Sequence, residues 1–194
     1  MKPPARKSRP PSPFVILLTL FTVVAGCGHL PLGPLRNQPG TYTNPKFAAV
    51  PSPPTGQFGA VGTGPLSGSS VIDGTQGGVL TVGRFTVTVP AGAFQDTATI
   101  SISIADQSIV ECNLSITPAA ANSFHLPVSL AADCSGVTNV DLKNCGTLWY
   151  DPQAGVWRTV TGAVVDLSAS TVTASLMHFS TYGVADLVDG RASW

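Results

Sequence analysis

Charged side chains are scarce in this chain. Lys, Arg, Asp and Glu together make up 10% of its 194 residues, and Glu111 is the only glutamate. The 10 basic residues match the 10 acidic ones, so the chain lacks the basic excess that nucleic-acid-binding domains carry. Carboxylate pairs of the glycosidase kind would have to come largely from Asp. Low charge with many small and β-branched residues is typical of an exported β domain rather than a cytoplasmic enzyme.

Histidines and recognisable catalytic motifs are also few. The chain has 3 histidines and no Gly-x-Ser-x-Gly or phosphate-binding loop. Its cysteines lack the paired short spacing of zinc sites. Asp133, Asn139 and Asp141 carry oxygens that calcium accepts, but oxygens of this kind are ordinary in solvated loops. We therefore predict no metal and no cofactor.

The first 26 residues have the three parts of an export signal. A basic stretch runs to Arg9, an apolar segment covers 14–24, and small residues follow. The apolar segment is too short to span a bilayer, which takes about 20 residues. Four basic residues precede it, so a chain beginning at Cys27 has 10 − 4 = 6 basic and 10 acidic residues and is mildly acidic.

The end of this signal reads Val24-Ala25-Gly26-Cys27. It resembles the lipobox of bacterial lipoproteins, in which an aliphatic and two small residues precede a Cys that becomes the acylated first residue. The resemblance implies a diacylated Cys27 and export to the outer membrane or the extracytoplasmic face of the plasma membrane. Two or more acyl chains hold a protein at a membrane almost irreversibly. An ordinary secretory signal with a chance Cys, or an uncleaved anchor, is the alternative.

The region 27–72 is rich in Pro and Gly and shows no long alternation of apolar and polar residues. We interpret it as the lipidated N-terminus and a flexible linker that lets the folded part stand off from the bilayer. Tyr42, Phe47 and Phe58 are unusual in a plain spacer, and docking of these rings on the domain or on a partner is the alternative to a passive linker.

Strand patterns with a period of two begin near Gly77. Apolar residues alternate with hydroxyl-bearing ones over 85–89, 100–104 and 110–116, and the alternation continues over 124–132. The Pro152–Gly155 stretch predicts a hairpin between strands at 147–151 and 156–160, and 164–167, 171–176 and 182–187 supply further strands. No window predicts an amphipathic helix. We predict an all-β antiparallel sandwich over 73–190.

Several short motifs in this region are similar to the ZU5 family. They are Gly77-Gly78 before a strand, the run Thr88-Val89-Pro90-Ala91-Gly92-Ala93-Phe94, Ile116-Thr117-Pro118 and the closing His178-Phe179-Ser180-Thr181-Tyr182. The resemblance covers about 77–188 and implies a β-sandwich interaction module. The matched residues imply a fold and no particular ligand.

Three cysteines remain beyond Cys27, in a compartment where disulfides persist. Cys134 follows one strand and Cys145 starts another, so we favour a bridge between these two, although the other pairings stay open. Cys112 lies on the apolar alternation of its strand, where a reduced Cys behaves as a small core residue.

One triplet, His178-Phe179-Ser180, carries a possible reaction. In some ZU5-containing scaffolds such a triplet cleaves itself: the hydroxyl attacks the carbonyl of the preceding Phe, the His takes the proton, and water opens the ester. Many family members keep the triplet uncut, with His at a strand end and Phe in the core. We therefore predict no enzyme, with self-cleavage of the Phe179–Ser180 bond as an alternative.

The sequence thus predicts a membrane-anchored lipoprotein whose sandwich is a noncatalytic interaction or envelope-structural module. Its expected partners are the membrane, through lipid on Cys27, and an envelope protein or glycan. We expect no nucleic acid. A carbohydrate- or peptidoglycan-binding module is a further alternative, because Trp149, Tyr150 and Trp157 lie on one hairpin and aromatic rings make sugar platforms.

Overall fold

The computed structural model describes residues 40–51 and 64–188. These residues belong to one of the two compact units of the chain, Pro34–Trp194, while the other unit, Met1–Gly33, lies outside the described part. The predicted signal over 1–26, the lipidation site Cys27 and the ring of Phe58 likewise lie outside the described residues. Among the described residues, no helix has the length and apolar character needed to cross a membrane.

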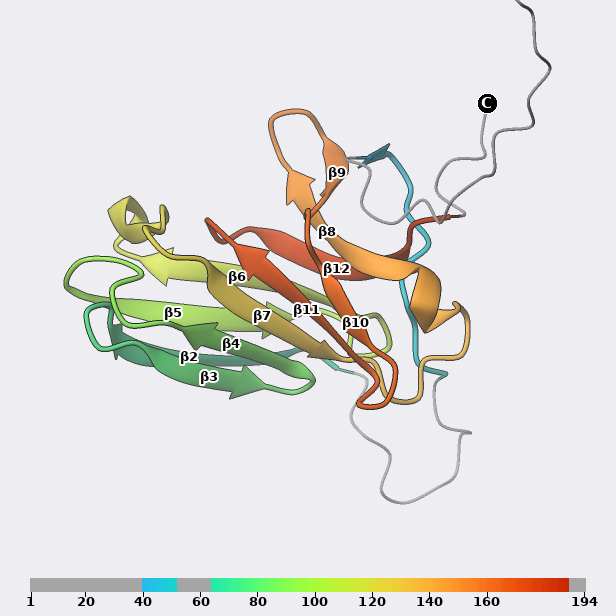
Figure 1. The fold of residues 1–194 in the computed structure, drawn as a ribbon, viewed down its shortest axis with the longest axis horizontal. Helices are drawn as coiled ribbons and strands as arrows, with labels where there is room; N and C mark the ends of the chain where they lie inside the picture. Colours follow the sequence, from blue (N-terminus) through green and yellow to red (C-terminus); the bar gives the residue numbers. More distant parts are fainter. Residues whose placement is uncertain (1–39, 52–63, 189–194) are drawn as a thin grey trace, which may run out of the picture. The chain divides into compact units, whose positions relative to one another are not determined.

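Two antiparallel sheets pack face to face, as the sequence predicted (Figure 1). The larger sheet has the order β1-β9-β8-β12-β6-β5-β2, and the smaller sheet has the order β10-β11-β7-β4-β3. Only two short 3₁₀ helices, η1 (Ala119–Ala121) and η2 (Leu142–Asn144), interrupt the strands in the described part. The strands are β1 (Thr41–Tyr42), β2 (Leu66–Asp73), β3 (Gly78–Val82), β4 (Phe85–Val89), β5 (Thr97–Ile104), β6 (Glu111–Thr117), β7 (Val128–Asp133), β8 (Cys145–Asp151), β9 (Val156–Thr159), β10 (Val164–Asp166), β11 (Thr171–Leu176) and β12 (Thr181–Asp186).

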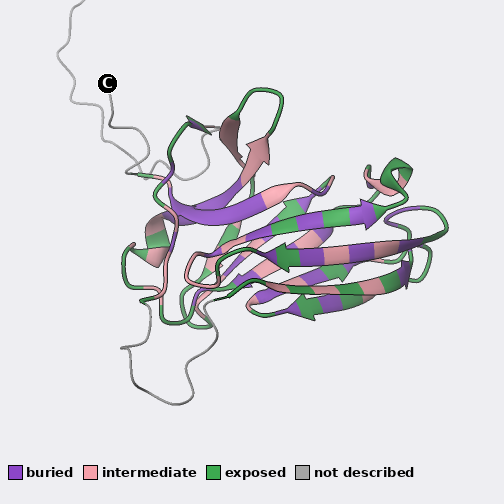
Figure 2. Ribbon diagram, turned by 180° about the vertical axis from the view of Figure 1, so that it is seen from behind, coloured by how far each residue is buried: buried purple, intermediate pink, exposed green. Residues whose placement is uncertain are grey.

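The core lies between the two sheets and is filled by the apolar positions of the alternating strands. Buried and exposed residues alternate along β4, β5 and β6, which confirms the period-two prediction (Figure 2). Burial of such side chains contributes about 25 cal/mol for each Å² of apolar surface removed from water. The outward positions of β5 and β6 carry Ser, Thr and Asn, which leave the outer face polar but almost uncharged.

Strands β8 and β12 do not alternate, because both of their faces are covered. Four consecutive residues of β8 from Cys145 and five of β12 from Tyr182 are buried. One face of these strands meets the main core, and the other forms a second small cluster with residues 42–47. The members of that cluster are the buried Tyr42, Leu148 and Ala185, with Phe47, Trp157 and Leu187 packed against them.

The predicted linker over 27–72 therefore needs correction at three places. Residues 41–42 form β1, residues 47–49 bridge to the larger sheet, and residues 66–72 belong to β2. The inner positions of β2 include Gly68 and Ser70, so no apolar alternation marks this strand in the sequence. Gly68 is required by close packing, because a Cβ there would lie 2.7 Å from Cγ2 of Val82.

The strand predicted over 124–132 is also shorter than expected. Strand β7 begins only at Val128, directly after Pro127. Phe124 is buried in the preceding loop, whereas Leu126 is 45% exposed. Proline lacks the N–H that a ladder needs, which explains why pairing starts after it.

Candidate functional site

The triplet His178-Phe179-Ser180 forms the bend between β11 and β12. The ring of Phe179 is buried and meets Phe124 edge-on, with 4.8 Å between centroids. The Tyr182 hydroxyl donates a hydrogen bond of 2.6 Å to the carbonyl of His178. Burial raises the pKa of the Tyr182 phenol well above its usual value, so this donor keeps its proton. The bend is thus fixed by the packing of Phe179 in the core and by the hydrogen bond from Tyr182 of β12.

Asn122 binds both backbone groups of Phe179. Its Oδ1 accepts a hydrogen bond of 2.6 Å from the Phe179 N–H, and its Nδ2 donates one of 3.1 Å to the Phe179 carbonyl. An asparagine side chain placed this way replaces the strand partner that the bend lacks. Sequence reasoning missed Asn122, because an Asn beside a short 3₁₀ helix is ordinary and its partner lies 57 residues away.

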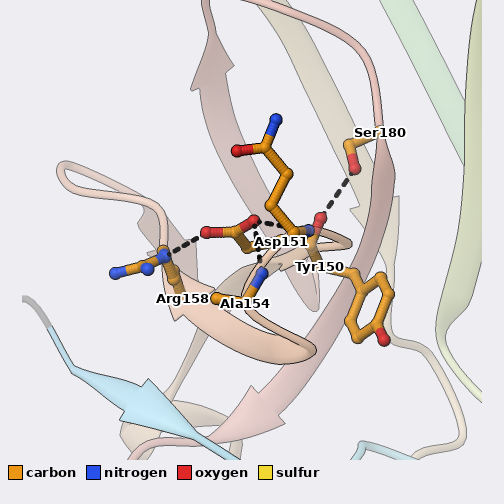
Figure 3. Close-up of polar contacts among 6 residues, drawn as sticks. Tyr150, Asp151, Ala154, Arg158 and Ser180 are labelled. Carbon is orange, nitrogen blue, oxygen red and sulfur yellow. Dashed lines mark hydrogen bonds and ion pairs between the residues drawn. The ribbon is translucent and has the colours of Figure 1, made fainter.

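The Ser180 hydroxyl does not hydrogen-bond to His178. It donates instead to the carbonyl of Tyr150 on β8, at 2.9 Å (Figure 3). The ring nitrogen Nδ1 of His178 lies 3.4 Å from the carbonyl oxygen of Phe179. Self-cleavage requires a base that takes the hydroxyl proton, and in this arrangement the hydroxyl donates its hydrogen bond to a backbone carbonyl of the neighbouring strand instead of to His178. The triplet is brought together, but its hydroxyl is used to join β8 to the start of β12.

No left-handed φ angle occurs at this peptide bond. Within the described residues, left-handed φ angles of non-glycine residues occur only at Asp96 and Ser170. Strained backbone conformations of this kind cost about 1–3 kcal/mol each and are one source of the distortion that amide cleavage needs. The bend at Phe179 and Ser180 contains none.

The aromatic residues of the β8–β9 hairpin contact other rings. Trp149 meets His178 edge-on at 5.0 Å between centroids, and Tyr150 lies 5.4 Å from Trp157. Trp157 also meets Phe47 at 4.8 Å with planes at 72°. All three hairpin aromatics are half-buried. Trp157 therefore packs on Phe47 and Trp149 packs on His178, so two rings of the predicted platform already contact residues outside the hairpin.

The hairpin tip is fixed by Asp151. Its carboxylate accepts a hydrogen bond of 2.8 Å from Nε of Arg158 and further hydrogen bonds from the backbone N–H groups of Gln153 and Ala154 (Figure 3). The Arg158 hydrogen bond, followed by those backbone donors, lowers the pKa of Asp151. The predicted Pro152–Gly155 turn is confirmed, and Gly155 has the left-handed φ of 67° that such turns favour.

Residues 46–50 form an additional short pairing in the larger sheet, between β12 and the segment before β6. The Ala48 N–H donates 2.8 Å to the Val184 carbonyl, and the Ala48 carbonyl accepts 2.9 Å from Val110. The Val50 N–H donates to the Ser108 carbonyl, and the Asp186 N–H donates to the Lys46 carbonyl. This segment, which the sequence placed in the linker, is a structural part of the sandwich. The alternative of docked aromatic rings is confirmed for Tyr42 and Phe47.

Asn139 fastens the same segment. Its Oδ1 accepts 2.7 Å from the Ala49 N–H and its Nδ2 donates 2.8 Å to the Phe47 carbonyl. Asp133 accepts from Ser135, and Asp141 accepts from the N–H of Lys143 at the start of η2. The three oxygen-bearing residues weighed for calcium thus have separate structural roles. No group of metal-ligating side chains is found among the described residues.

The predicted Cys134–Cys145 bridge is not formed in this structure. Both are buried free thiols, as is Cys112. Cys134 Sγ lies 3.7 Å from the Ala132 carbonyl and Cys145 Sγ lies 3.5 Å from that of Asp141, so each thiol points to its own acceptor. Burial raises the pKa of Cys134 to about 11 and that of Cys145 to about 12. Such thiols are poor nucleophiles near neutral pH.

The chain matches no known protein-family model, and a search of curated proteins likewise gives no match.

Proposed function

We propose that this protein is a lipid-anchored envelope protein whose β-sandwich is a noncatalytic interaction module held at the membrane through Cys27. The sequence Val24-Ala25-Gly26-Cys27 after an apolar segment supports the anchor. The module's resemblance to the ZU5 family rests on the short motifs between Gly77 and Tyr182.

The observation that carries this proposal is the docking of residues 46–50 into the larger sheet. With the sandwich starting at Gly40, only 40 − 27 = 13 steps of chain separate it from Cys27. Thirteen residues reach at most about 45 Å even when fully extended. A lipid on Cys27 would therefore keep the module close to its membrane, at a shorter reach than a linker ending near residue 72 would give.

A noncatalytic role agrees with the hydrogen bonds at the triplet. The Ser180 hydroxyl, the Phe179 amide and the His178 carbonyl all serve to fix one bend. A carbohydrate-binding role draws less support, because Trp157 packs on Phe47 and Tyr150. If sugar binding is nevertheless the function, Trp149→Ala should abolish retention on peptidoglycan or a glycan array.

The test of the anchor uses the full chain in cells fed labelled palmitate. We expect label in the wild type, none in Cys27→Ser, and partition of only the wild type into the detergent phase. Equal behaviour of the two forms would overturn the anchor and leave an exported β domain. The Cys112→Ser variant is a matched control, because its thiol is buried and should not affect labelling.

A further inference from the structure

Strand β2 is the longest edge strand among the described residues. Among the described residues β5 is the only strand that pairs with β2. The other three sheet edges are short: β1 has 2 residues, β10 has 3 and β3 has 5, whereas β2 has 8. Natural proteins protect edges by shortening them or by placing Lys or Pro in them. Strand β2 contains neither, and its only charge is Asp73 at its end.

The hydrogen-bond register identifies which backbone groups of β2 face the open side. The Gly74 N–H donates 2.8 Å to the Asp96 carbonyl, in line with the Asp73↔Thr97 pairing. In an antiparallel ladder, residues that bond to the partner strand alternate with residues that do not. Gly68, Ser70 and Ile72 therefore bond to β5. The N–H and C=O groups of Ser67, Ser69 and Val71 point toward the open edge.

These three residues form a self-complementary set. If a second β2 runs antiparallel to the first about a twofold axis at Ser69, Ser69 lies opposite its own copy, and Ser67 lies opposite Val71. Each of these pairs can exchange two backbone hydrogen bonds, which gives about six across the interface. The symmetry is that of an isologous dimer, the commonest kind of homo-oligomer.

Side chains and charge favour the same register. Ser67 and Ser69 are exposed and small, and Val71 is 68% exposed. In this register Asp73 lies opposite Pro65 of the second copy (65 + 73 = 2 × 69), so the two carboxylates stay apart at opposite ends. The neighbouring outward residues Ser101 and Ser103 on β5 are also uncharged. Like charges directly opposite one another would destabilise a strand pair, and none occur here.

From these observations we infer that two copies of this chain pair through β2, joining their larger sheets into one continuous antiparallel sheet. The pairing depends on β2 alone and not on lipid at Cys27. If both copies are anchored in one membrane, confinement raises their effective concentration and favours the dimer further.

Cross-linking of the full chain in its membrane, or in detergent micelles, tests the inferred contact. Ser69→Cys places two thiols opposite each other, within reach of a bismaleimide that spans about 8 Å, less than two strand spacings. Ser101→Cys is the matched control, since Ser101 pairs with Ser69 one strand further in. Two copies of Ser101 would lie about three strand spacings apart, so we expect at least about tenfold more cross-linked dimer from Ser69→Cys.

Charged substitutions at Ser69, the residue on the twofold axis, distinguish loss of the β2 pairing from misfolding of the chain. Ser69→Lys places two cations opposite each other and should give monomers by light scattering, and Ser69→Asp should do the same. An equal mixture of the two variants should restore the dimer mass. Each variant alone should keep the wild-type unfolding midpoint measured at monomer concentrations, because Ser69 is exposed. A wild type that stays monomeric, or equal cross-linking of Ser69→Cys and Ser101→Cys, would overturn the inference.

Discussion

The ring of Phe47 meets the ring of Trp157 edge-on, with 4.8 Å between centroids and 72° between planes. One residue comes from the N-terminal segment and the other from β9, more than 100 positions later in the chain. Their contact closes a second cluster on the outside of β8 and β12. Residues 42–47 are therefore folded with the sandwich.

The contact between Phe47 and Gly183 should be measurable by a double-mutant cycle. A Cβ at Gly183 would lie 2.5 Å from Cε1 of Phe47, so Gly183→Ala should displace the ring and cost about 2 kcal/mol of unfolding free energy. Phe47→Ala should cost a similar amount through lost packing, about 2 kcal/mol. In the double variant, Gly183→Ala should add much less than it does alone, because the obstructing ring is gone.

Urea unfolding of the full chain gives these free energies, and Leu167→Ala at an exposed turn position is the control that should leave them unchanged. If Phe47→Ala unfolded at the wild-type midpoint, the segment would contribute nothing to the sandwich.

Asn122→Ala should destabilise the bend at Phe179. The substitution removes the partner of the Phe179 N–H and leaves the Phe179 carbonyl only the 3.4 Å contact with Nδ1 of His178. Each buried group that is left unpaired costs about 1–3 kcal/mol. We expect a total loss of about 2–4 kcal/mol, measured by thermal and urea unfolding. Asn44→Ala removes an exposed side chain of the same kind and should change stability by less than about 0.5 kcal/mol. Equal effects of the two substitutions would rule out the bridging role of Asn122.

The Phe179–Ser180 bond should remain uncut. Because the Ser180 hydroxyl donates to the Tyr150 carbonyl, His178 has no access to its proton in the folded chain. Intact-mass analysis and denaturing gels should show one unbroken polypeptide for both the wild type and Ser180→Ala. A wild-type fragment that begins at Ser180, and disappears in Ser180→Ala and His178→Ala, would instead establish self-cleavage.

The buried thiols should resist alkylation until the chain unfolds. At pH 8, iodoacetamide should modify neither Cys134 nor Cys145 in the folded protein, since burial raises both of their pKa values. In urea without reductant, three cysteines beyond Cys27 should react, as expected for free thiols. A count of one would mean that two of them are joined by a disulfide in the isolated protein.

The same thiols give stability a dependence on alkaline pH. The unfolded chain loses these protons near the ordinary thiol pKa of 9.0, whereas the folded chain holds them up to about 11 at Cys134 and about 12 at Cys145. The unfolded state then binds fewer protons, so stability falls as pH rises from about 9 to about 12. Cys134→Ser and Cys145→Ser should each flatten this fall in pH-dependent urea unfolding. An unchanged slope in both variants would contradict the raised pKa values.

The sequence predicted the strands whose two faces differ. Along β4 and β5 an apolar residue alternates with Ser or Thr, because one face packs in the core and the other meets water. Strand β2 escaped prediction, because its inner face uses Gly68 and Ser70 against the other sheet. Residues 46–50 escaped prediction because their pairing is made by backbone groups, which any residue other than proline can supply.

The residues of the candidate site likewise divide into those whose position could be predicted from the sequence and those whose contacts could not. Burial of Cys112 followed from its apolar position in a strand, and burial of Phe179 was implied by the ZU5 resemblance; both are confirmed. Asn122 and Asn139 act on backbone groups 57 and about 90 residues away, a relationship that no local pattern records. The bond between Ser180 and Tyr150 likewise depends on how β8 lies beside β12. The sequence shows which residue types form the triplet. Only the fold shows which group accepts the hydrogen bond from the Ser180 hydroxyl.

The Tyr42 hydroxyl donates a hydrogen bond of 3.4 Å to the Leu187 carbonyl, and the Asp186 N–H donates to the Lys46 carbonyl, so residues 42–46 lie beside the end of β12 in the described fold. Domains with adjoining termini tolerate insertion into host proteins and circular permutation. We therefore expect the sandwich to fold when it is inserted into a surface loop of an unrelated host protein through residues near 42 and 187. Its other surfaces should then be exposed without rearrangement.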